Sequence, residues 1–198
     1  MGNKIYKTDF LEDEKVFGIL ANGGIGVLPT DTIYGVIGGA LNKETVERIY
    51  KVRERTPSKP FIILISSISD LDNFGIELNK FQSDFLNKVW PGSVSVILPI
   101  KDNKFSYLIR GGDTLAFRLP NLPELLNVLK RVGPIVAPSA NIEGEPSAVN
   151  IEEAENYFKD NIDFYVDMGR RESLPSTIVK LEENTATILR EGVTVIDL

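Results

Sequence analysis

Residues 134–147 read Pro-Ile-Val-Ala-Pro-Ser-Ala-Asn-Ile-Glu-Gly-Glu-Pro-Ser, and this stretch indicates how the chain is organised. An apolar run ends at Ala137, and the short polar residues Ser139, Asn141 and Ser147 follow it around a turn. Polar side chains placed just after a buried strand often form a binding site on a rigid support. The same residue types are ordinary turn formers, so this stretch alone leaves a plain turn open as the alternative.

Segments typical of strands and helices alternate on both sides of this stretch. Short apolar runs bounded by turn residues predict strands at 25–28, 33–37, 61–65, 94–98, 115–119, 135–137, 164–166, 178–181 and 186–189. Capping residues and helical apolar spacing predict five helices. The first is opened by Asp9 with Glu12 and ends near Gly23, and the second is opened by Asn42. The third covers residues 81–89, the fourth starts at Pro123, and the fifth is opened by Asn150 with Glu153. The sequence therefore predicts one α/β domain (mixed α+β) over residues 1–198, with a mixed parallel and antiparallel sheet flanked by helices.

Composition limits the chemistry that the protein performs. The 198 residues are 42% hydrophobic, contain no cysteine and no histidine, and carry a net charge of −6. Thiolate nucleophiles, histidine zinc sites and imidazole acid–base catalysis are thereby excluded. Lys, Arg, carboxylates and hydroxyls remain, and they suit positioning and charge stabilisation. The polar N-terminus and the lack of a long apolar run predict a cytoplasmic protein that is not inserted in a membrane.

Four cations stand close together in an acidic chain, namely Lys51, Arg53, Arg55 and Lys59. They follow a predicted helix and lead into a predicted buried strand. Arginine binds phosphate oxygens with two parallel hydrogen bonds, and lysine supplies a compact charge, so a phosphate site is one interpretation. A solvated run of charges at the end of a helix is the other.

Two further patterns place polar groups at the ends of strands. Thr30, Asp31, Thr32 and Tyr34 occupy a bend between two apolar runs, where they either face a polar ligand or form a loop in which Asp31 bonds its own backbone. Arg118 interrupts an apolar strand, and a charge there must be paired or must face a ligand. The chain has neither a Walker P-loop nor a Gly-x-Gly-x-x-Gly fingerprint.

Taken in order, these motifs resemble the YrdC-like family, the threonylcarbamoyl-AMP synthases of tRNA modification, in its short single-domain type. The elements that carry the resemblance span most of the chain. They are Pro29-Thr-Asp-Thr-Ile-Tyr-Gly35, Ser58-Lys-Pro60, Trp90-Pro-Gly92, Phe117-Arg118, Pro138-Ser-Ala-Asn141, Gly144-Glu-Pro-Ser147, Pro175-Ser-Thr177 and Leu189-Arg190.

The resemblance implies a YrdC-like fold with a twisted mixed sheet and a basic concave surface. It also implies a nucleotidyltransferase that makes threonylcarbamoyl-AMP and pyrophosphate from L-threonine, bicarbonate or CO2, and ATP. Partner proteins would transfer the threonylcarbamoyl group to adenosine 37 of tRNA, and Mg²⁺ would ride on the ATP phosphates rather than in a protein cage.

The resemblance also implies roles for individual residues. The threonine-side contacts would be Thr32, Tyr34, Arg118, Ser139 and Ser176. The nucleotide-side contacts would be Arg53, Arg55, Lys59, Thr114, Asn141, Ser147 and Arg190. Arg55, Lys59 and Arg118 would contribute most to catalysis.

Some positions depart from the family pattern. Arg53 stands where lysine is usual, and Thr56 and Ser93 stand where proline is common. Ser95 replaces a usual threonine, and residues 168–173 are more charged than the usual glycine-rich stretch.

Two other classes of function stay open from the sequence. The basic run would also suit a module that binds double-stranded RNA or tRNA weakly, although the net charge of −6 argues against that as the main role. A carbamoyl-transfer domain of the hydrogenase-maturation type is the other, although the chain lacks the cysteine-rich zinc region of those proteins.

Overall fold

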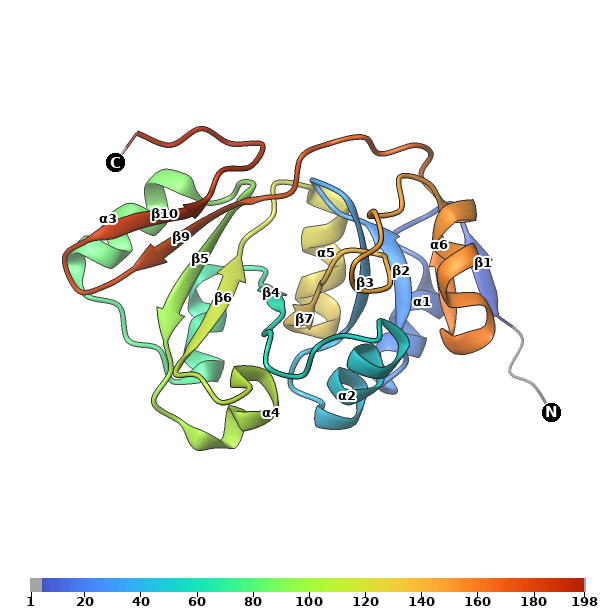
Figure 1. The fold of residues 1–198 in the computed structure, drawn as a ribbon, viewed down its shortest axis with the longest axis horizontal. Coiled ribbons are helices and arrows are strands. Elements are labelled where there is room, and N and C mark those ends of the chain that lie inside the picture. Colours follow the sequence, from blue (N-terminus) through green and yellow to red (C-terminus); the bar gives the residue numbers. More distant parts are fainter. Residues whose placement is uncertain (1–4, 198) are drawn as a thin grey trace.

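A single mixed sheet runs through the molecule, as the sequence predicts (Figure 1). The computed structural model describes residues 5–197. The strand order is β1-β8-β2-β3-β7-β4-β6-β5-β9-β10. The strands are β1 (Tyr6–Thr8), β2 (Gly26–Pro29), β3 (Tyr34–Gly39), β4 (Ile62–Leu64), β5 (Val94–Pro99), β6 (Thr114–Arg118), β7 (Ile135–Val136), β8 (Phe164–Val166), β9 (Thr177–Leu181) and β10 (Ala186–Arg190).

Parallel and antiparallel pairs alternate irregularly along this order. The pairs β1–β8, β8–β2, β4–β6 and β5–β9 are parallel. The pairs β2–β3, β3–β7, β7–β4, β6–β5 and β9–β10 are antiparallel. Neighbouring strands are mostly distant in sequence, so this order brings together loops that are far apart along the chain.

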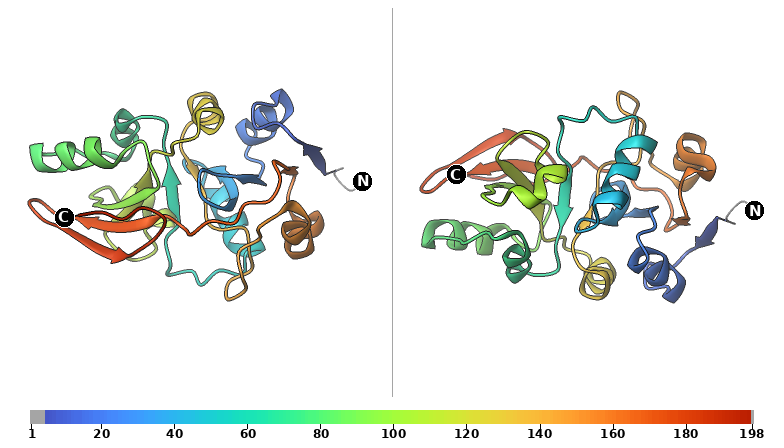
Figure 2. Two further views of the ribbon diagram at one scale, coloured as in Figure 1. Left: turned by 90° about the horizontal axis from the view of Figure 1, so that it is seen from above. Right: turned by 90° about the horizontal axis from the view of Figure 1, so that it is seen from below.

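Helices cover both faces of the sheet (Figure 2). On one side lie α1 (Glu14–Ala21), α3 (Lys80–Val89) and α5 (Pro123–Val132), and on the other lie α2 (Lys43–Val52) and α6 (Ile151–Phe158). The shorter elements are α4 (Ser106–Ile109) and three 3-10 helices over Ile68–Phe74, Asn103–Phe105 and Lys159–Asn161. No helix over the described residues 5–197 has the length and apolar character that a membrane span requires.

The core divides into two layers because successive strand residues point to opposite faces. In β4, Ile63 packs with the layer that contains Ile49 of α2, whereas Leu64 packs with the layer that contains Leu125 of α5. Both strand residues are fully buried. The prediction of a strand buried on both faces is thus confirmed for the region 61–65.

Local signals located the longer elements, but they placed the start of the first helix wrongly and gave no sign of β1, α4 or the 3-10 helices. Asp13, not Asp9, caps α1, because its Oδ1 accepts a hydrogen bond from Lys15 N at 2.8 Å. Asn42 and Asn150 cap α2 and α6 as predicted. In the predicted capping box of α6, Glu153 would accept a hydrogen bond from the backbone N of Asn150. Its carboxylate accepts instead from Val149 N, one residue earlier.

Candidate active site

One cavity of about 500 Å³ brings most of the predicted site residues together. Of the twelve residues predicted for binding or catalysis, ten line it, and only Lys59 and Asn141 do not. The ten are Thr32, Tyr34, Arg53, Arg55, Thr114, Arg118, Ser139, Ser147, Ser176 and Arg190. Cavities of this volume are typical of small-molecule sites.

The two walls that sequence order leaves unconnected meet in the sheet. β3 pairs with β7, and beyond β7 an isolated antiparallel bridge joins Gly35 to Ser139. Pro138 O also accepts from Val36 N at 2.9 Å, and Tyr34 O accepts from Ala140 N at 2.9 Å. The Thr-Asp-Thr bend and the Ser-Ala-Asn stretch are therefore adjacent walls of one cavity.

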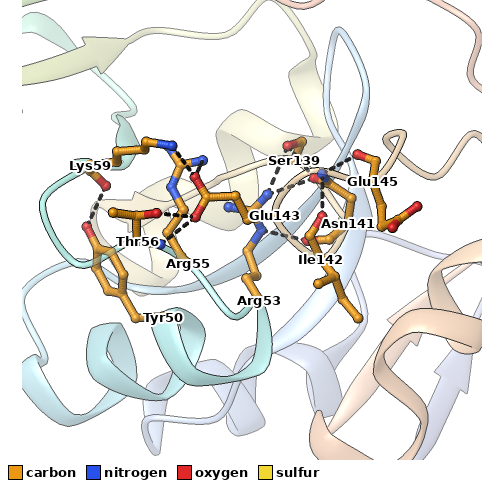
Figure 3. Close-up of polar contacts among 10 residues, drawn as sticks. All are labelled: Tyr50, Arg53, Arg55, Thr56, Lys59, Ser139, Asn141, Ile142, Glu143 and Glu145. Atoms are coloured by element: carbon orange, nitrogen blue, oxygen red, sulfur yellow. Dashed lines mark hydrogen bonds and ion pairs between the residues drawn. The ribbon is translucent and has the colours of Figure 1, made fainter.

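The side chain of Arg53 holds the Ser-Ala-Asn stretch, residues 139–141, in place through hydrogen bonds. Its side chain is only 1% exposed, and its Nε donates to Asn141 O at 3.0 Å. Its Nη2 donates to Asn141 Oδ1 at 2.7 Å and to Ser139 Oγ at 3.2 Å (Figure 3). Burial, and next the neighbouring charge of Arg55, lower the pKa of Arg53 to about 10, so the group stays cationic at neutral pH.

Asn141 has its polar atoms engaged inside the protein. Its Oδ1 accepts from Arg53 and from Ser139 Oγ at 2.6 Å, and its Nδ2 donates to the carbonyls of Ile142 and Glu145 at 2.9 and 2.7 Å. These contacts hold the loop after β7 in a fixed shape. The predicted nucleotide contact at Asn141 stays a prediction, and what the geometry displays is a loop clamp.

Glu143 is a member of the site that the sequence reasoning missed. Its carboxylate pairs with Lys59 Nζ, lies 3.6 Å from Arg55 Nη1, and accepts from Thr56 Oγ1 at 2.8 Å (Figure 3). These bonds, with Lys59 contributing most, lower the pKa of Glu143 to about 2. No local motif marks this residue, because its partners lie more than eighty positions earlier in the chain.

Arg118 is paired, which is one of the two environments that the sequence predicts for a charge within an apolar strand. Its Nη1 lies 2.7 Å from Asp31 Oδ1 and donates to Thr32 Oγ1 at 3.2 Å, and both charged side chains are 5% exposed. Asp31 Oδ2 accepts in turn from Ser93 Oγ at 3.1 Å and from Asn121 N at 3.3 Å. Burial lowers the pKa of Arg118, and the charge of Asp31 opposes that change. The alternative in which Asp31 bonds only its own backbone is wrong.

The far wall comes from β5, β9 and β10. Ser176 Oγ and Ser95 Oγ are 2.9 Å apart and buried, and Arg190 Nη2 donates to Ser176 O at 2.7 Å. Burial lowers the pKa of Arg190. Ser95, whose role the sequence left open, thus positions Ser176.

The phenol of Tyr34 holds the segment that crosses the cavity between β8 and β9. It donates to Gly169 O at 2.8 Å and accepts from Met168 N at 3.1 Å. The same segment contributes Ser173 and Pro175 to the cavity lining. Tyr34 therefore lines the cavity, while its hydroxyl is already bonded to the protein.

The cavity favours an anionic ligand that is rich in hydrogen-bond acceptors. Four arginines and no carboxylate line it. Within residues 5–197, the Nε atoms of Arg55 and Arg118 are buried without a hydrogen-bond partner. A buried donor without an acceptor is costly, so these two atoms mark positions where ligand oxygens would be stabilised.

One family model and several curated proteins match most of this chain. The family model Sua5_yciO_yrdC, described as "Telomere recombination", matches residues 18–192. A putative threonylcarbamoyl-AMP synthase of Methanocaldococcus jannaschii is 29% identical over 195 residues, which is 96% of this chain and 92% of that protein. The threonylcarbamoyl-AMP synthase of Pyrococcus abyssi is 33% identical over 178 residues, covering 88% of this chain but 52% of the relative, so the chain spans about half of that protein.

A solved structure shares the fold. The crystal structure of P. abyssi Sua5 complexed with L-threonine superposes with a TM-score of 0.86 at 29% identity, over 96% of this chain and 57% of that one. The architecture described above is thus that of a protein known to bind threonine.

Proposed function

The chain belongs to the Sua5, YciO and YrdC family, and we propose that it is a threonylcarbamoyl-AMP synthase. The observation that carries the proposal is the cavity lined by four arginines and a set of hydroxyls, with two buried guanidinium N–H groups that lack acceptors among the described residues. Such a lining matches two anionic substrates, a nucleoside triphosphate and an amino acid carboxylate.

The proposed reaction needs no histidine and no covalent intermediate. The amine of L-threonine adds to CO2 and gives a carbamate. A carbamate oxygen then attacks the α-phosphate of ATP, the bond to the β-phosphate oxygen breaks, and pyrophosphate leaves. The negative charge on the phosphoryl oxygens must be stabilised in the transition state of such transfers, and fixed cations lower the activation free energy in this way.

We assign the phosphates to the wall formed by residues 53–59 and to Arg190. Arg55 and Lys59 would neutralise charge on the triphosphate and on the leaving pyrophosphate, and Thr114 and Ser147 would contact the rest of the nucleotide. Arg53 acts through its bonds to Ser139 and Asn141, so we propose that both Arg53 and Asn141 position the nucleotide wall.

Threonine would lie against Arg118 and the hydroxyl groups around it. Arg118 has a buried Nε that lacks a partner among residues 5–197, and an incoming carboxylate would supply one. Thr32, Ser139 and Ser176 present hydroxyls from three separate parts of the chain to the same cavity. Holding the carbamate in line with the α-phosphate is the contribution that this arrangement makes to the rate.

Mg²⁺ would enter with the nucleotide as part of the substrate. Over residues 5–197 no group of three or more acidic side chains could hold a metal ion. The donor set of the cavity does not form a protein cage for Mg²⁺, which prefers carboxylate, phosphate and water oxygens. We therefore assign the metal to the phosphate oxygens and attribute the remaining stabilisation to the arginines and Lys59.

The product adenylate would pass to proteins that transfer the threonylcarbamoyl group to tRNA in the cytoplasm. The family resemblance implies this role, and the chemistry of the product is compatible with it, because a mixed carbamic–phosphoric anhydride is an activated acyl donor. Direct binding of tRNA by this chain is a separate proposal, which the basic residues at the cavity favour and the net charge of −6 opposes.

The test supplies L-threonine, bicarbonate and ATP with Mg²⁺ and follows pyrophosphate. We expect pyrophosphate release that requires both threonine and bicarbonate. Release without threonine, or release driven by carbamoyl phosphate in place of threonine and bicarbonate, would refute the assignment. Salt-sensitive RNA binding with no threonine-dependent turnover would favour an RNA-binding module instead.

A further inference from the structure

The loop that follows β7 places a carboxylate on the cations assigned to the phosphates. Glu143 contacts Lys59, Arg55 and Thr56 together, and its backbone N donates to Arg53 O at 2.9 Å. Its side chain is 18% exposed, so the group is largely shielded by its partners. Figure 3 shows the carboxylate between the ends of the two basic side chains.

We propose that Glu143 is a built-in counter-anion of the phosphate-binding wall, which holds Arg55 and Lys59 in place and sets the affinity for the nucleotide by competing with its phosphates. This inference rests on the proposed function for the identity of the ligand. It assigns an affinity-setting role to a residue that does not itself line the cavity.

The geometry supports exchange of the carboxylate for a phosphate. A carboxylate and a phosphate accept the same kinds of bond from guanidinium, ammonium, hydroxyl and backbone N–H groups. The Glu143 carboxylate accepts from a backbone N–H and a hydroxyl of Thr56, and it pairs with two cations, which are four donors that a phosphate group could also use. Arg55 keeps its Nε without a partner among residues 5–197, so Glu143 does not saturate the site.

Charge decides the direction of the effect. An incoming polyphosphate must either displace Glu143 or lie beside it, and each outcome costs free energy. Displacement breaks the ion pairs that Glu143 makes with Lys59 and Arg55, and binding beside it brings two negative charges together. Removing the negative charge therefore tightens phosphate binding in either case. A residue with a purely structural role would weaken binding or leave it unchanged when it is replaced.

The experiment measures binding of inorganic pyrophosphate by calorimetry to the wild-type protein and to Glu143→Gln. Glutamine keeps an acceptor for Thr56 but removes the charge that masks Lys59 and Arg55. We expect pyrophosphate to bind roughly 5–10-fold more tightly, which corresponds to an ion pair of partly exposed groups. Unchanged or weaker binding by a folded Glu143→Gln protein would overturn the proposal.

Glu145→Gln is the matched control, because it makes the same change in net charge two residues away. Glu145 is exposed, and its side chain points away from Arg55 and Lys59 in Figure 3. We expect its pyrophosphate affinity to stay close to that of the wild type. An equal tightening in both variants would indicate a general charge effect and would overturn the specific role of Glu143.

A second measurement avoids any dependence on the variant. In wild-type protein with ¹³C-labelled glutamate, the Glu143 carboxyl resonance should shift when pyrophosphate saturates the site, and an unchanged resonance on saturation would overturn the proposal. Failure of the proposed function is separate. If Glu143→Gln binds pyrophosphate more tightly but the wild type shows no threonine-dependent turnover, this inference stands and the synthase assignment fails. If the wild type shows that turnover but Glu143→Gln has unaltered pyrophosphate affinity, the synthase assignment stands and this inference fails.

Discussion

Asp31 and Arg118 form an ion pair that the protein holds almost completely out of water. The Asp31 carboxylate also accepts from Ser93 and from the backbone of Asn121, so it is fixed before any ligand arrives. Arg118 in turn reaches Thr32. This pair sets the position of the cation to which we assign the threonine carboxylate.

Replacing Asp31 should therefore affect stability as well as substrate use. In Asp31→Asn, Arg118 keeps its charge but loses its partner, and breaking a buried pair in this way costs about 3 kcal/mol of unfolding free energy. Urea unfolding at pH 7 measures the loss. Glu182→Gln is the control, because Glu182 pairs with Lys180 at the exposed surface and its removal should not move the midpoint. Equal midpoints for Asp31→Asn and the wild type would contradict the prediction.

Arg53 offers a test that separates a loop anchor from a phosphate ligand. Arg53→Met removes three hydrogen bonds to Ser139 and Asn141, and we expect the unfolding free energy to fall by about 3 kcal/mol, since bonds to a charged group contribute strongly. Arg53→Lys keeps the charge but loses the forked geometry of the guanidinium. An anchor predicts that lysine does not restore stability, whereas a lysine variant with wild-type stability and nucleotide affinity would indicate that the charge alone matters.

At the scale of elements, the loop after β7 and the residues after α2 are joined by Glu143, and that link depends on pH. The carboxyl pKa is about 2 in the folded protein, against an ordinary value of 4.5. A carboxyl whose pKa is lower when folded stabilises the protein fully above its unfolded pKa, and this stabilisation disappears as the pH falls from about 4.5 towards 2.

The wild-type urea midpoint should accordingly drop more steeply than that of Glu143→Gln between pH 5 and pH 3. The difference between the two proteins isolates this group from other carboxylates with lowered pKa values, such as Asp13 and Asp102. Glu145→Gln, measured over the same range, should follow the wild-type curve. Parallel curves for the wild type and Glu143→Gln would show that the link contributes nothing to stability.

The elements themselves were largely predictable, and the reasons differ from one to the next. Asn42 and the apolar spacing after it suffice for α2, and Ile63 and Leu64 show why a continuous apolar run is a strand with two buried faces. The first helix was misplaced because Asp9 and Asp13 are both suitable caps, and only the bond to Lys15 N selects Asp13. β1 was missed because Tyr-Lys-Thr is too short to show a period.

The site was predictable only where a residue is anomalous in its own segment. Arg118 stands out as a cation in an apolar strand, and the polar residues after Ala137 stand out at a strand end. Asp31 and Glu143 look ordinary within their own segments. Asp31 is paired with Arg118, 87 positions away, and Glu143 with Lys59, 84 positions away. Such pairs can be predicted only when the order of the strands is known. Side-chain identity alone could not show that Asn141 and Arg53 bond each other.

For the whole molecule, the cavity is where distant parts of the sheet contribute to one site. Arg118 is the last residue of β6, Ser139 follows β7, Ser176 directly precedes β9, and Arg190 is the last residue of β10. The segment from Asp167 to Ser176 runs between β8 and β9, two strands that lie far apart in the sheet order, and Tyr34 ties down its start (Figure 1). A ligand that fills the cavity would therefore touch both parts of the sheet and the segment that connects them.

Saturating ligand should consequently stabilise the molecule as a unit. With L-threonine and a non-hydrolysable ATP analogue each at 100 times its dissociation constant, each ligand should raise the unfolding free energy by about 2.7 kcal/mol, because ligands that bind only the folded state shift the equilibrium by mass action. Hydrogen exchange should slow in residues 167–176 as well as in the strands. In Arg118→Ala the shift caused by threonine should disappear while the shift caused by the analogue remains, since Arg118 is assigned to threonine alone. Loss of both shifts, or protection confined to one side of the cavity, would contradict a single composite site.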